Sequence, residues 1–382
     1  MDIPPLSMMD DLLCVSECGH RSYMVNAFIN YKTNSKKLQF GTDKCIKMHV
    51  GRIQEEYKCR KLAIDEWTEK ARFDNEKQQL EIKDSFEGVK EMEEKNEEKY
   101  LGVLISKDGK NMKNIKERVA KGTGIVKRIL TILDSIPLGK HYFEVGMILR
   151  DSLLISSILY NAEAWYNLTN SELNFIETVD RMFFRKLLNS PKSTPTEMFY
   201  LELGCIPFRQ IIREKRLSFL HYILNEDSKS LINKFFKTQL RYRTNKDWVT
   251  TVIDDLKILE IKLSFEEIRR MKKENFMKVV KNKIMTKTFQ SMEELKGNHS
   301  KVKNIEYENI SMQKYLKPNR CEMSLADAQL IFRLRCRMTN VKMNLKGAYD
   351  NLECTACGLE EETQIHLVNC QKLNEKRMKK KF

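Results

Sequence analysis

Three cysteines and one histidine near the C-terminus have the spacing of a zinc site. Cys354, Cys357, His366 and Cys370 form the pattern C-x2-C-x8-H-x3-C. Two thiols separated by two residues fit a tight turn around zinc, Gly358 frees the backbone there, and a nearby His/Cys pair completes a tetrahedral set. Because protein supplies all four ligands, we expect this zinc to organise the fold and not to catalyse a reaction. Knuckles this small commonly contact single-stranded nucleic acid, and a module that binds proteins is the alternative.

Two adjacent carboxylates interrupt an apolar, strand-like run near the N-terminus. Asp10 and Asp11 lie within LSMMDDLLCVSEC, which we expect to form an antiparallel hairpin. Strands are depleted in aspartate, and neighbouring carboxylates repel each other unless something neutralises them. A bound divalent cation would do so. A solvated turn between two strands is the simpler alternative.

A second group of possible metal ligands lies in the same region. Its members are Cys14, Cys18, His20, Cys45 and His49. On one strand, Cys14 and Cys18 would be about 13 Å apart at about 3.3 Å per residue, too far to share a zinc ion. We therefore interpret Cys14 as a core residue.

The charge of the chain is basic and unevenly distributed. There are 68 Lys and Arg against 53 Asp and Glu, a net charge of +15. Residues 54–99 carry 15 acidic and 10 basic side chains, so this segment has a charge of −5 and the rest of the chain +20. Such a balance suits a polyanion such as RNA or DNA, although generic solubility is also compatible with it.

The ten cysteines and the apolar segments indicate an intracellular protein, nuclear or cytoplasmic. No signal-peptide pattern begins the sequence, so we expect free or metal-bound thiols in a reducing compartment. The longest apolar stretch, 145–166, contains Arg150, Asp151 and Glu163. These charges predict a buried helix and not a membrane span.

The periodicity of the sequence predicts an α+β, mostly α protein. A turn and short strand follow LQFG, the run VKEMEEKNEEK is typical of a solvated loop or exposed helix, and YLGVLIS at 100–106 alternates like a strand. Helical patterns then dominate from about residue 111. Capping boxes are predicted at three helix starts, Thr169 with Glu172, Thr194 with Glu197, and Ser264 with Glu267.

Several of these motifs together resemble the C-terminal half of the polyprotein of non-LTR (LINE-type) retrotransposons. The group in question pairs a reverse transcriptase with a CCHC knuckle and a restriction-like endonuclease. MMDDLL resembles the Tyr/Phe-x-Asp-Asp palm hairpin, with Met8 in the aromatic position, LQFGTDKC the next palm motif, and KYLGVLISKDGK the primer grip. SSILYNAEAWYNLT, STPTEMFYLELGCIP and REKRLSFLHYIL are similar to the thumb region, and CTACG followed by TQIHLVNC to the knuckle.

This resemblance implies a domain order and a polymerase chemistry. Residues 1–110 would be a partial palm with a charged insertion at 53–99, 111–225 a helical thumb, 226–345 a helical linker, and 346–382 the zinc knuckle and basic tail. Asp10 would hold magnesium with Asp11 beside it, and Lys44 would lie near the triphosphate. Basic thumb helices would grip an RNA template and a DNA primer by their phosphates.

The departures from the family pattern limit the expected activity. The palm needs a further aspartate upstream of the hairpin, and only nine residues precede Asp10. The endonuclease pattern is also missing after Cys370. We therefore expect a fragment of an RNA-directed DNA polymerase that is inactive alone. The alternative is a protein that binds RNA or DNA through its helices and knuckle without catalysis.

Overall fold

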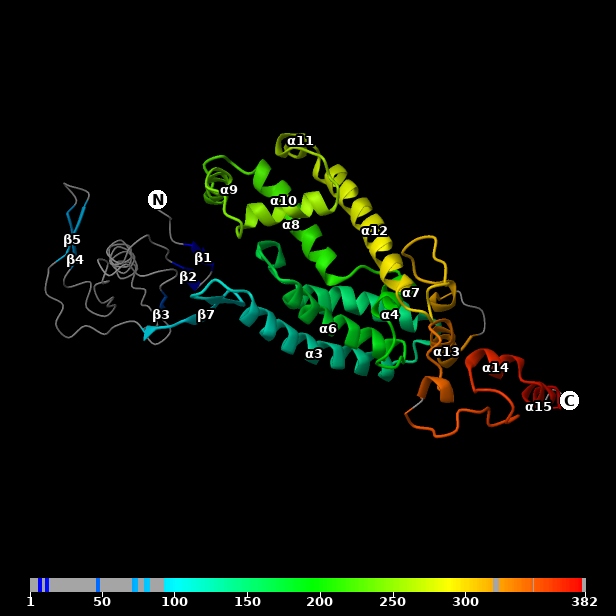
Figure 1. Cartoon of the computed structure of the whole chain (residues 1–382). Coiled ribbons are helices and arrows are strands. Elements are labelled where there is room, and N and C mark those ends of the chain that lie inside the picture. The colour runs from blue at the N-terminus through cyan, green and yellow to red at the C-terminus, as the bar shows by residue number, and fades with distance from the viewer. Residues whose placement is uncertain are drawn as a thin grey trace. The chain divides into compact units, whose positions relative to one another are not determined.

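Helices make up most of the part of the chain that can be described. The computed structural model describes residues 6–8, 11–13, 46–48, 71–74, 79–82, 93–318, 323–345 and 347–379. It divides into two units, Met1–Asn114 and Ile115–Phe382. Short strands lie in the first unit, whereas helices and a Cys/His cluster make up the second (Figure 1). The predicted mostly helical class is confirmed at this level.

The described strands of the first unit form two-stranded sheets. Antiparallel pairs are β1 (Leu6–Met8) with β2 (Asp11–Leu13), β4 (Ala71–Asp74) with β5 (Gln79–Ile82), and β7 (Glu97–Tyr100) with β8 (Val103–Ser106), and a parallel pair is β3 (Ile46–Lys47) with β6 (Glu93–Glu94). In the first pair, Met8 lies opposite Asp11. The antiparallel hairpin predicted from the apolar run is therefore present in the backbone.

The single strand predicted over 100–106 is wrong, because the chain reverses at its second residue. Leu101 and Gly102 have φ angles of 48° and 74°, which is the combination that a tight hairpin turn requires. The charged residues before the turn therefore form β7 and not the predicted loop or helix. Glu97 of β7 forms an ion pair with Lys113, which follows the hairpin.

The second unit is helical from its first residues, as predicted. Its α-helices are α3 (Met112–Ser135), α4 (Tyr142–Leu149), α5 (Ser156–Ile158), α6 (Asn170–Leu187), α7 (Thr196–Leu203), α8 (Phe208–Asn225), α9 (Leu231–Arg241), α10 (Trp248–Ile258), α11 (Phe265–Arg270), α12 (Lys273–Gly297), α13 (Leu325–Arg335), α14 (Gln364–Asn369) and α15 (Gln371–Lys379). Shorter turns are η3 (Gly139–His141), η5 (Ala162–Ala164), η6 (Lys314–Leu316) and η7 (Lys342–Leu345). The predicted apolar helix near 142–166 contains a π-helical segment, η4 (Arg150–Ile155), between α4 and α5. None of the helices in the described ranges is long and apolar enough to cross a membrane.

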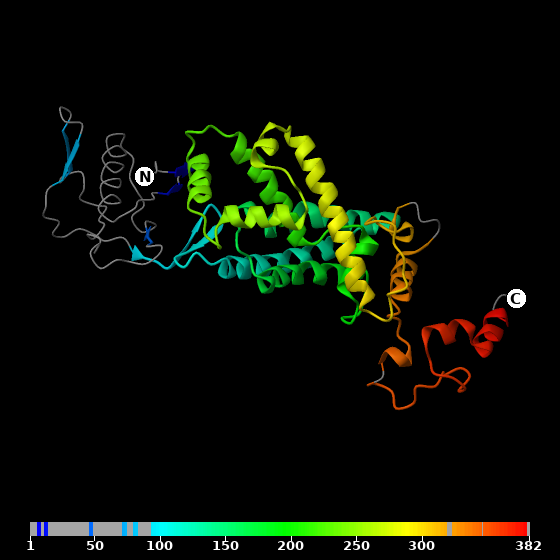
Figure 2. The same ribbon diagram turned by 45° about the horizontal axis from the view of Figure 1, so that its top comes forward.

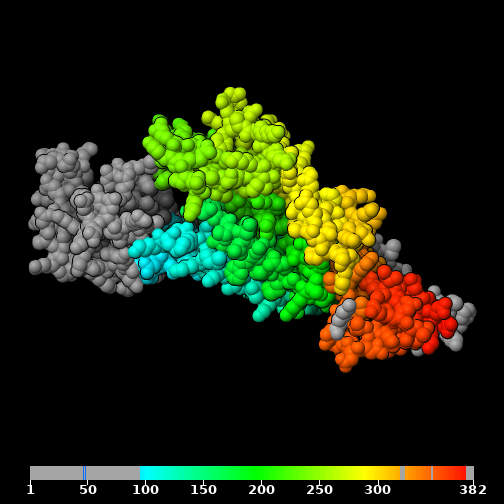
Figure 3. All heavy atoms as spheres, in the orientation of Figure 1, coloured from blue at the N-terminus to red at the C-terminus, as the bar shows by residue number. Residues whose placement is uncertain are grey.

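Two hydrophobic cores lie side by side in this unit, and α8 and α12 take part in both. Phe208 of α8 and Met292 of α12 belong to the core that α3, α4, α6, α7 and α13 share. Leu217 and Phe276 of the same two helices belong to the core of α9, α10 and α11. Figures 1 and 2 show α8 and α12 running between the two groups of helices. In the space-filling view, α9 to α11 form one lobe and α3 to α6 another (Figure 3).

Two of the three predicted capping boxes are confirmed. They are Thr169 with Glu172 at α6 and Ser264 with Glu267 at α11. The box predicted at Thr194 is wrong, because α7 begins at Thr196 and places Pro195, which has no side-chain acceptor, in the capping position. Ser324 and Asp327 form a box at α13 that was not predicted, since aspartate replaces the usual Glu or Gln.

Candidate metal centre

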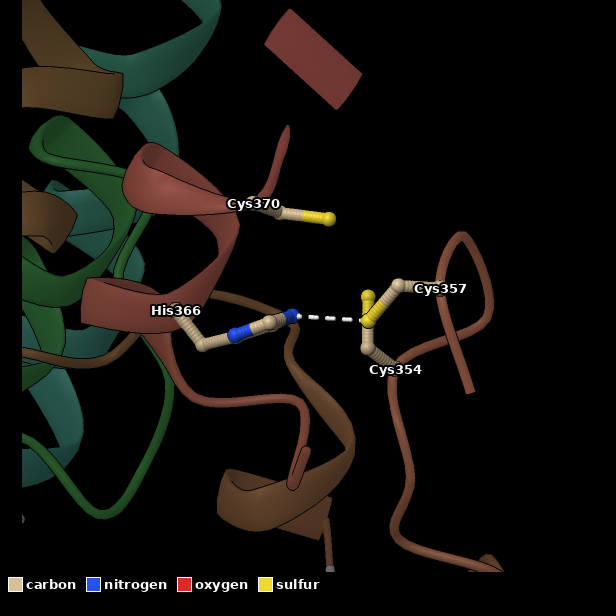
Figure 4. Close-up of side chains that lie close together, drawn as sticks. All are labelled: Cys354, Cys357, His366 and Cys370. Atoms are coloured by element: carbon tan, nitrogen blue, oxygen red, sulfur yellow. Dashed lines mark hydrogen bonds between the residues drawn. The ribbon is translucent and has the colours of Figure 1, made fainter. Parts of the chain in front are cut away.

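The four predicted zinc ligands lie together in the second unit. The ligand atoms of Cys354, Cys357, His366 and Cys370 are all within 4.8 Å of one another. Figure 4 shows the two thiols of one loop facing His366 and Cys370 across a small gap. A tetrahedral ion with ligands at about 2.3 Å spaces them about 3.8 Å apart, so only a small inward movement would complete the coordination. The residues therefore fit a zinc ion.

The first two ligands are positioned by a tight turn of the backbone. The amide of Gly358 donates to the carbonyl of Cys354 at 2.8 Å, and the φ angle of Gly358 is +66°. A left-handed residue at this point favours glycine, as expected from the sequence. The amide of Leu359 then donates to the Cys357 sulfur at 3.5 Å. Glu353 and Glu361 pair across the loop as an antiparallel bridge, which closes it.

The histidine is positioned by α14 and by a carboxylate that was not predicted. Thr363 caps α14 by accepting the His366 amide hydrogen at 3.0 Å. The Nε2 atom of His366 lies 3.3 Å from the Cys357 sulfur, whereas its Nδ1 atom lies 2.9 Å from the Glu360 carboxylate. Nδ1–H donating to Glu360 leaves Nε2 for the metal, an arrangement common around zinc-bound histidines. No spacing rule identifies Glu360, since its carboxylate meets the ring only once both loop and helix have formed.

The cysteine and histidine ligands shift one another's pKa values. The amide of Leu359 lowers the pKa of Cys357 to about 7. Burial lowers the pKa of His366, but hydrogen bonds with Cys354, Cys357 and Glu360 outweigh it and raise the pKa to about 8. A thiolate and an imidazolium therefore coexist near neutral pH, and a zinc ion would take the place of the proton.

The zinc loop is tied to the helices before it by hydrogen bonds. Gln364 donates from Nε2 to the carbonyl of Leu334 at 2.8 Å and accepts from Thr339 at 3.0 Å. The Glu362 carboxylate accepts from the amide of Lys342, before the loop, at 3.3 Å, and from the amide and hydroxyl of Thr355, within the loop, at 3.1 and 2.9 Å. With four protein ligands, the site has no open position for a substrate and fits a structural ion.

The residues that the resemblance assigns to polymerase chemistry are only partly described. Asp11 is the first residue of β2, whereas Asp10 and Lys44 lie outside the described residues. The second cysteine and histidine group, Cys14 to His49, also lies outside them. Their roles remain predictions. Within the described ranges, the C-terminal cluster is the group of His, Cys, Asp and Glu that could hold a metal ion.

Comparisons of the chain with protein-family models, with curated proteins and with solved structures gave no match.

Proposed function

We propose that this chain binds nucleic acid, as part of a reverse transcriptase of the LINE type, and that zinc holds its C-terminal module together. The observation that carries the proposal is the charge on α3, the first long helix of the second unit. A basic helical face is the feature that a phosphate backbone recognises without reading its sequence.

The two sides of α3 have opposite character. Its buried side packs into the core that it shares with α4, α6, α7 and α13, through Ile115, Val126, Ile129 and Leu133. Its exposed side carries Lys116, Lys121, Lys127 and Arg128. Among the described residues, none of these four basic side chains forms an ion pair with a carboxylate. Their charge is therefore open to a ligand from solvent.

Other arginines of the same unit are already neutralised and do not contribute to such a surface. Arg216 is 5% exposed and donates to both carboxylate oxygens of Asp255 at 2.7 and 3.1 Å. Arg209 forms a similar two-bond pair with Glu177, at 2.8 Å for both contacts. The distinction matters because only an exposed, unneutralised cation releases counterions from nucleic acid when it binds.

The zinc module adds an apolar surface beside its ligands. Leu359, Ile365 and Val368 are 83%, 59% and 59% exposed. Apolar side chains exposed to this extent on a small module usually serve contact with a partner. Unpaired bases are a suitable partner, because they offer flat apolar faces to a protein surface. A protein partner is the alternative for this surface.

Replacing the four basic residues of α3 by glutamine is expected to weaken binding of single-stranded RNA by about 600-fold at about 0.1 M salt, because each lost phosphate contact is worth about fivefold there. The plot of log affinity against log salt should also become shallower by about 3. Fluorescence anisotropy with a labelled RNA at several salt concentrations measures both quantities.

A matched control removes the same charge from α9 and the start of α12, which belong to the other core. Lys234, Lys272, Lys273 and Lys278 are exposed there, and changing all four to glutamine should alter affinity far less. Equal losses in the two variants would mean that net charge and not the α3 face determines binding. That result would contradict the proposal.

Primer extension distinguishes a polymerase from a binding-only protein. The polymerase form predicts magnesium-dependent extension of a DNA primer on an RNA template, reduced to background by Asp10→Ala because a metal ligand is lost. Asp134→Asn, which removes an exposed carboxylate of α3, is the control and should leave extension unchanged. If the wild-type chain binds primer and template without extending them, catalysis by this chain alone is ruled out, and nucleic-acid binding is the part of the proposal that stands.

A further inference from the structure

A basic hollow lies where α6 ends and the chain turns toward α7. Its volume is about 540 Å³, and the residues around it are Met182, Arg185, Lys186, Asn189, Ser190 and Lys192. Three of the six carry positive charge, and none carries a carboxylate. The other three residues supply an amide, a hydroxyl and a thioether, and most of the exposed lining is apolar. A hollow with this lining suits an anion with several oxygen atoms.

Two of the residues that line this hollow each have a buried hydrogen-bonding atom without a partner. The Nε atom of Arg185 and the hydroxyl of Ser190 make no hydrogen bond to any described residue. Burial and the charge of Arg181 lower the pKa of Arg185, as expected for a cation with no anion beside it. Buried polar atoms are normally paired, so two orphaned groups at one hollow point to a missing ligand.

The position of Arg185 is fixed by contacts other than an ion pair. Its guanidinium lies 5.9 Å from the ring centre of Phe199, and one terminal nitrogen donates to the carbonyl of Lys192 at 3.4 Å. These contacts hold the side chain against the wall of the hollow. The group is therefore arranged before a ligand arrives, which lowers the entropic cost of binding.

The end of α6 does not oppose an anion at this place. Helix C-termini are normally negative because their last carbonyls are unpaired. Here the carbonyls of Phe184, Arg185 and Lys186 accept from the amides of residues 188, 190 and 189 at 2.9, 2.9 and 3.2 Å. The carbonyl of Leu187 accepts from the side-chain amide of Gln329 at 3.0 Å. All four carbonyls are thus occupied.

We propose that this hollow binds one phosphate of the nucleic-acid backbone, a site separate from the α3 face. The inference rests on the proposed nucleic-acid binding. A phosphodiester supplies one negative charge and oxygen acceptors for the Arg185 and Ser190 donors, while Lys186 and Lys192 lie exposed at the rim. The hollow is larger than a phosphate group, so it has room for the adjoining sugar.

The test uses two variants of the full chain with different expected signatures. Lys186→Gln/Lys192→Gln should weaken single-stranded RNA binding about fivefold at about 0.1 M salt and make the salt dependence shallower by about 0.7, as for one lost phosphate contact. Ser190→Ala removes an uncharged donor. It should weaken binding about tenfold with the salt dependence unchanged, because a hydrogen bond to a charged group is lost. Its unfolding midpoint should not fall, since the hydroxyl has no partner in the free protein.

The other possible outcomes distinguish a failure of the phosphate site from a failure of the proposed nucleic-acid binding. The control Lys278→Gln on α12 should bind RNA nearly as wild type. If wild type binds RNA and both pocket variants match it, the phosphate site is wrong while nucleic-acid binding stands. If wild type fails to bind RNA, the proposed function is wrong, and this inference with it. If inorganic phosphate raises the unfolding temperature of wild type but not of Ser190→Ala, while RNA affinity is unaffected, the site binds free phosphate and the backbone assignment is overturned.

Discussion

Replacing Cys357 by serine is expected to lower the zinc affinity of the chain by more than about 100-fold, since even the loss of an outer partner of a ligand typically costs about 10- to 100-fold. The C-terminal module should then lose its structure. Among its described side chains, the buried ones are the zinc ligands Cys354, His366 and Cys370. A segment without an apolar core depends on its metal ion to fold. Zinc content by elemental analysis and protection of this segment from protease would measure both effects.

Two further variants test whether the loss of zinc depends on the four ligands. Cys205→Ser removes a thiol outside the cluster and should leave one zinc ion per chain. Glu360→Gln keeps all four ligands but weakens the hydrogen bond to His366, and because the Glu360 side chain is 73% exposed we expect a loss near about tenfold. The helical content from α3 to α13 should not change in any of them. Full retention of zinc by Cys357→Ser would contradict the assignment of the ligands.

Replacing Asp180 by alanine is expected to destabilise the helical unit by about 3 to 5 kcal/mol, because it leaves a buried arginine without its counter-charge. Asp180 is fully buried and Arg150 only 2% exposed. Arg150 donates from Nε and from one terminal nitrogen to the two Asp180 oxygens, at 2.7 and 2.8 Å. Its guanidinium also lies 5.1 and 5.4 Å from the ring centres of Phe184 and Phe208. Urea unfolding followed by circular dichroism measures the loss.

Two control variants distinguish the effect of an unpaired buried charge from the effect of losing an ion pair. Arg150→Met with Asp180→Leu removes both charges at once, so we expect most of the stability to return. Glu266→Ala breaks an exposed ion pair with Arg270. The two side chains are 71% and 75% exposed, so this variant should have no measurable effect on the free energy of unfolding. If Asp180→Ala were as mild as Glu266→Ala, the buried pair could not be a major contributor to the stability of this unit.

The zinc ligands could be predicted from sequence because they are local. Cys354 and Cys357 share one turn, and His366 lies in α14 with Cys370 directly after it, so spacing alone restricts their geometry. The same reasoning predicted where helices dominate, since an apolar stripe is visible within one segment. It failed for 100–106, where a turn residue other than glycine, Leu101, adopts a left-handed conformation. Leucine gives no signal for that turn.

The tertiary contacts could not be predicted, because they join residues distant in sequence. Arg150 and Asp180 are 30 positions apart and Arg216 and Asp255 are 39 apart, and nothing in either segment identifies the partner. The hollow at the end of α6 differs, because its lining residues all lie within 182–192 and are local in sequence. The lysines were visible in the sequence, whereas the missing partners of the Arg185 Nε atom and the Ser190 hydroxyl were not.

A salt titration of RNA affinity with the zinc-loaded wild-type chain tests the central claim most directly. If α3 and the hollow contact phosphates, log affinity should fall linearly with log salt with a slope of about −0.7 per contact, and therefore steeper than about −3 overall. An affinity that does not change with salt, or no binding at low salt, would contradict the claim that this chain binds nucleic acid through its basic surface.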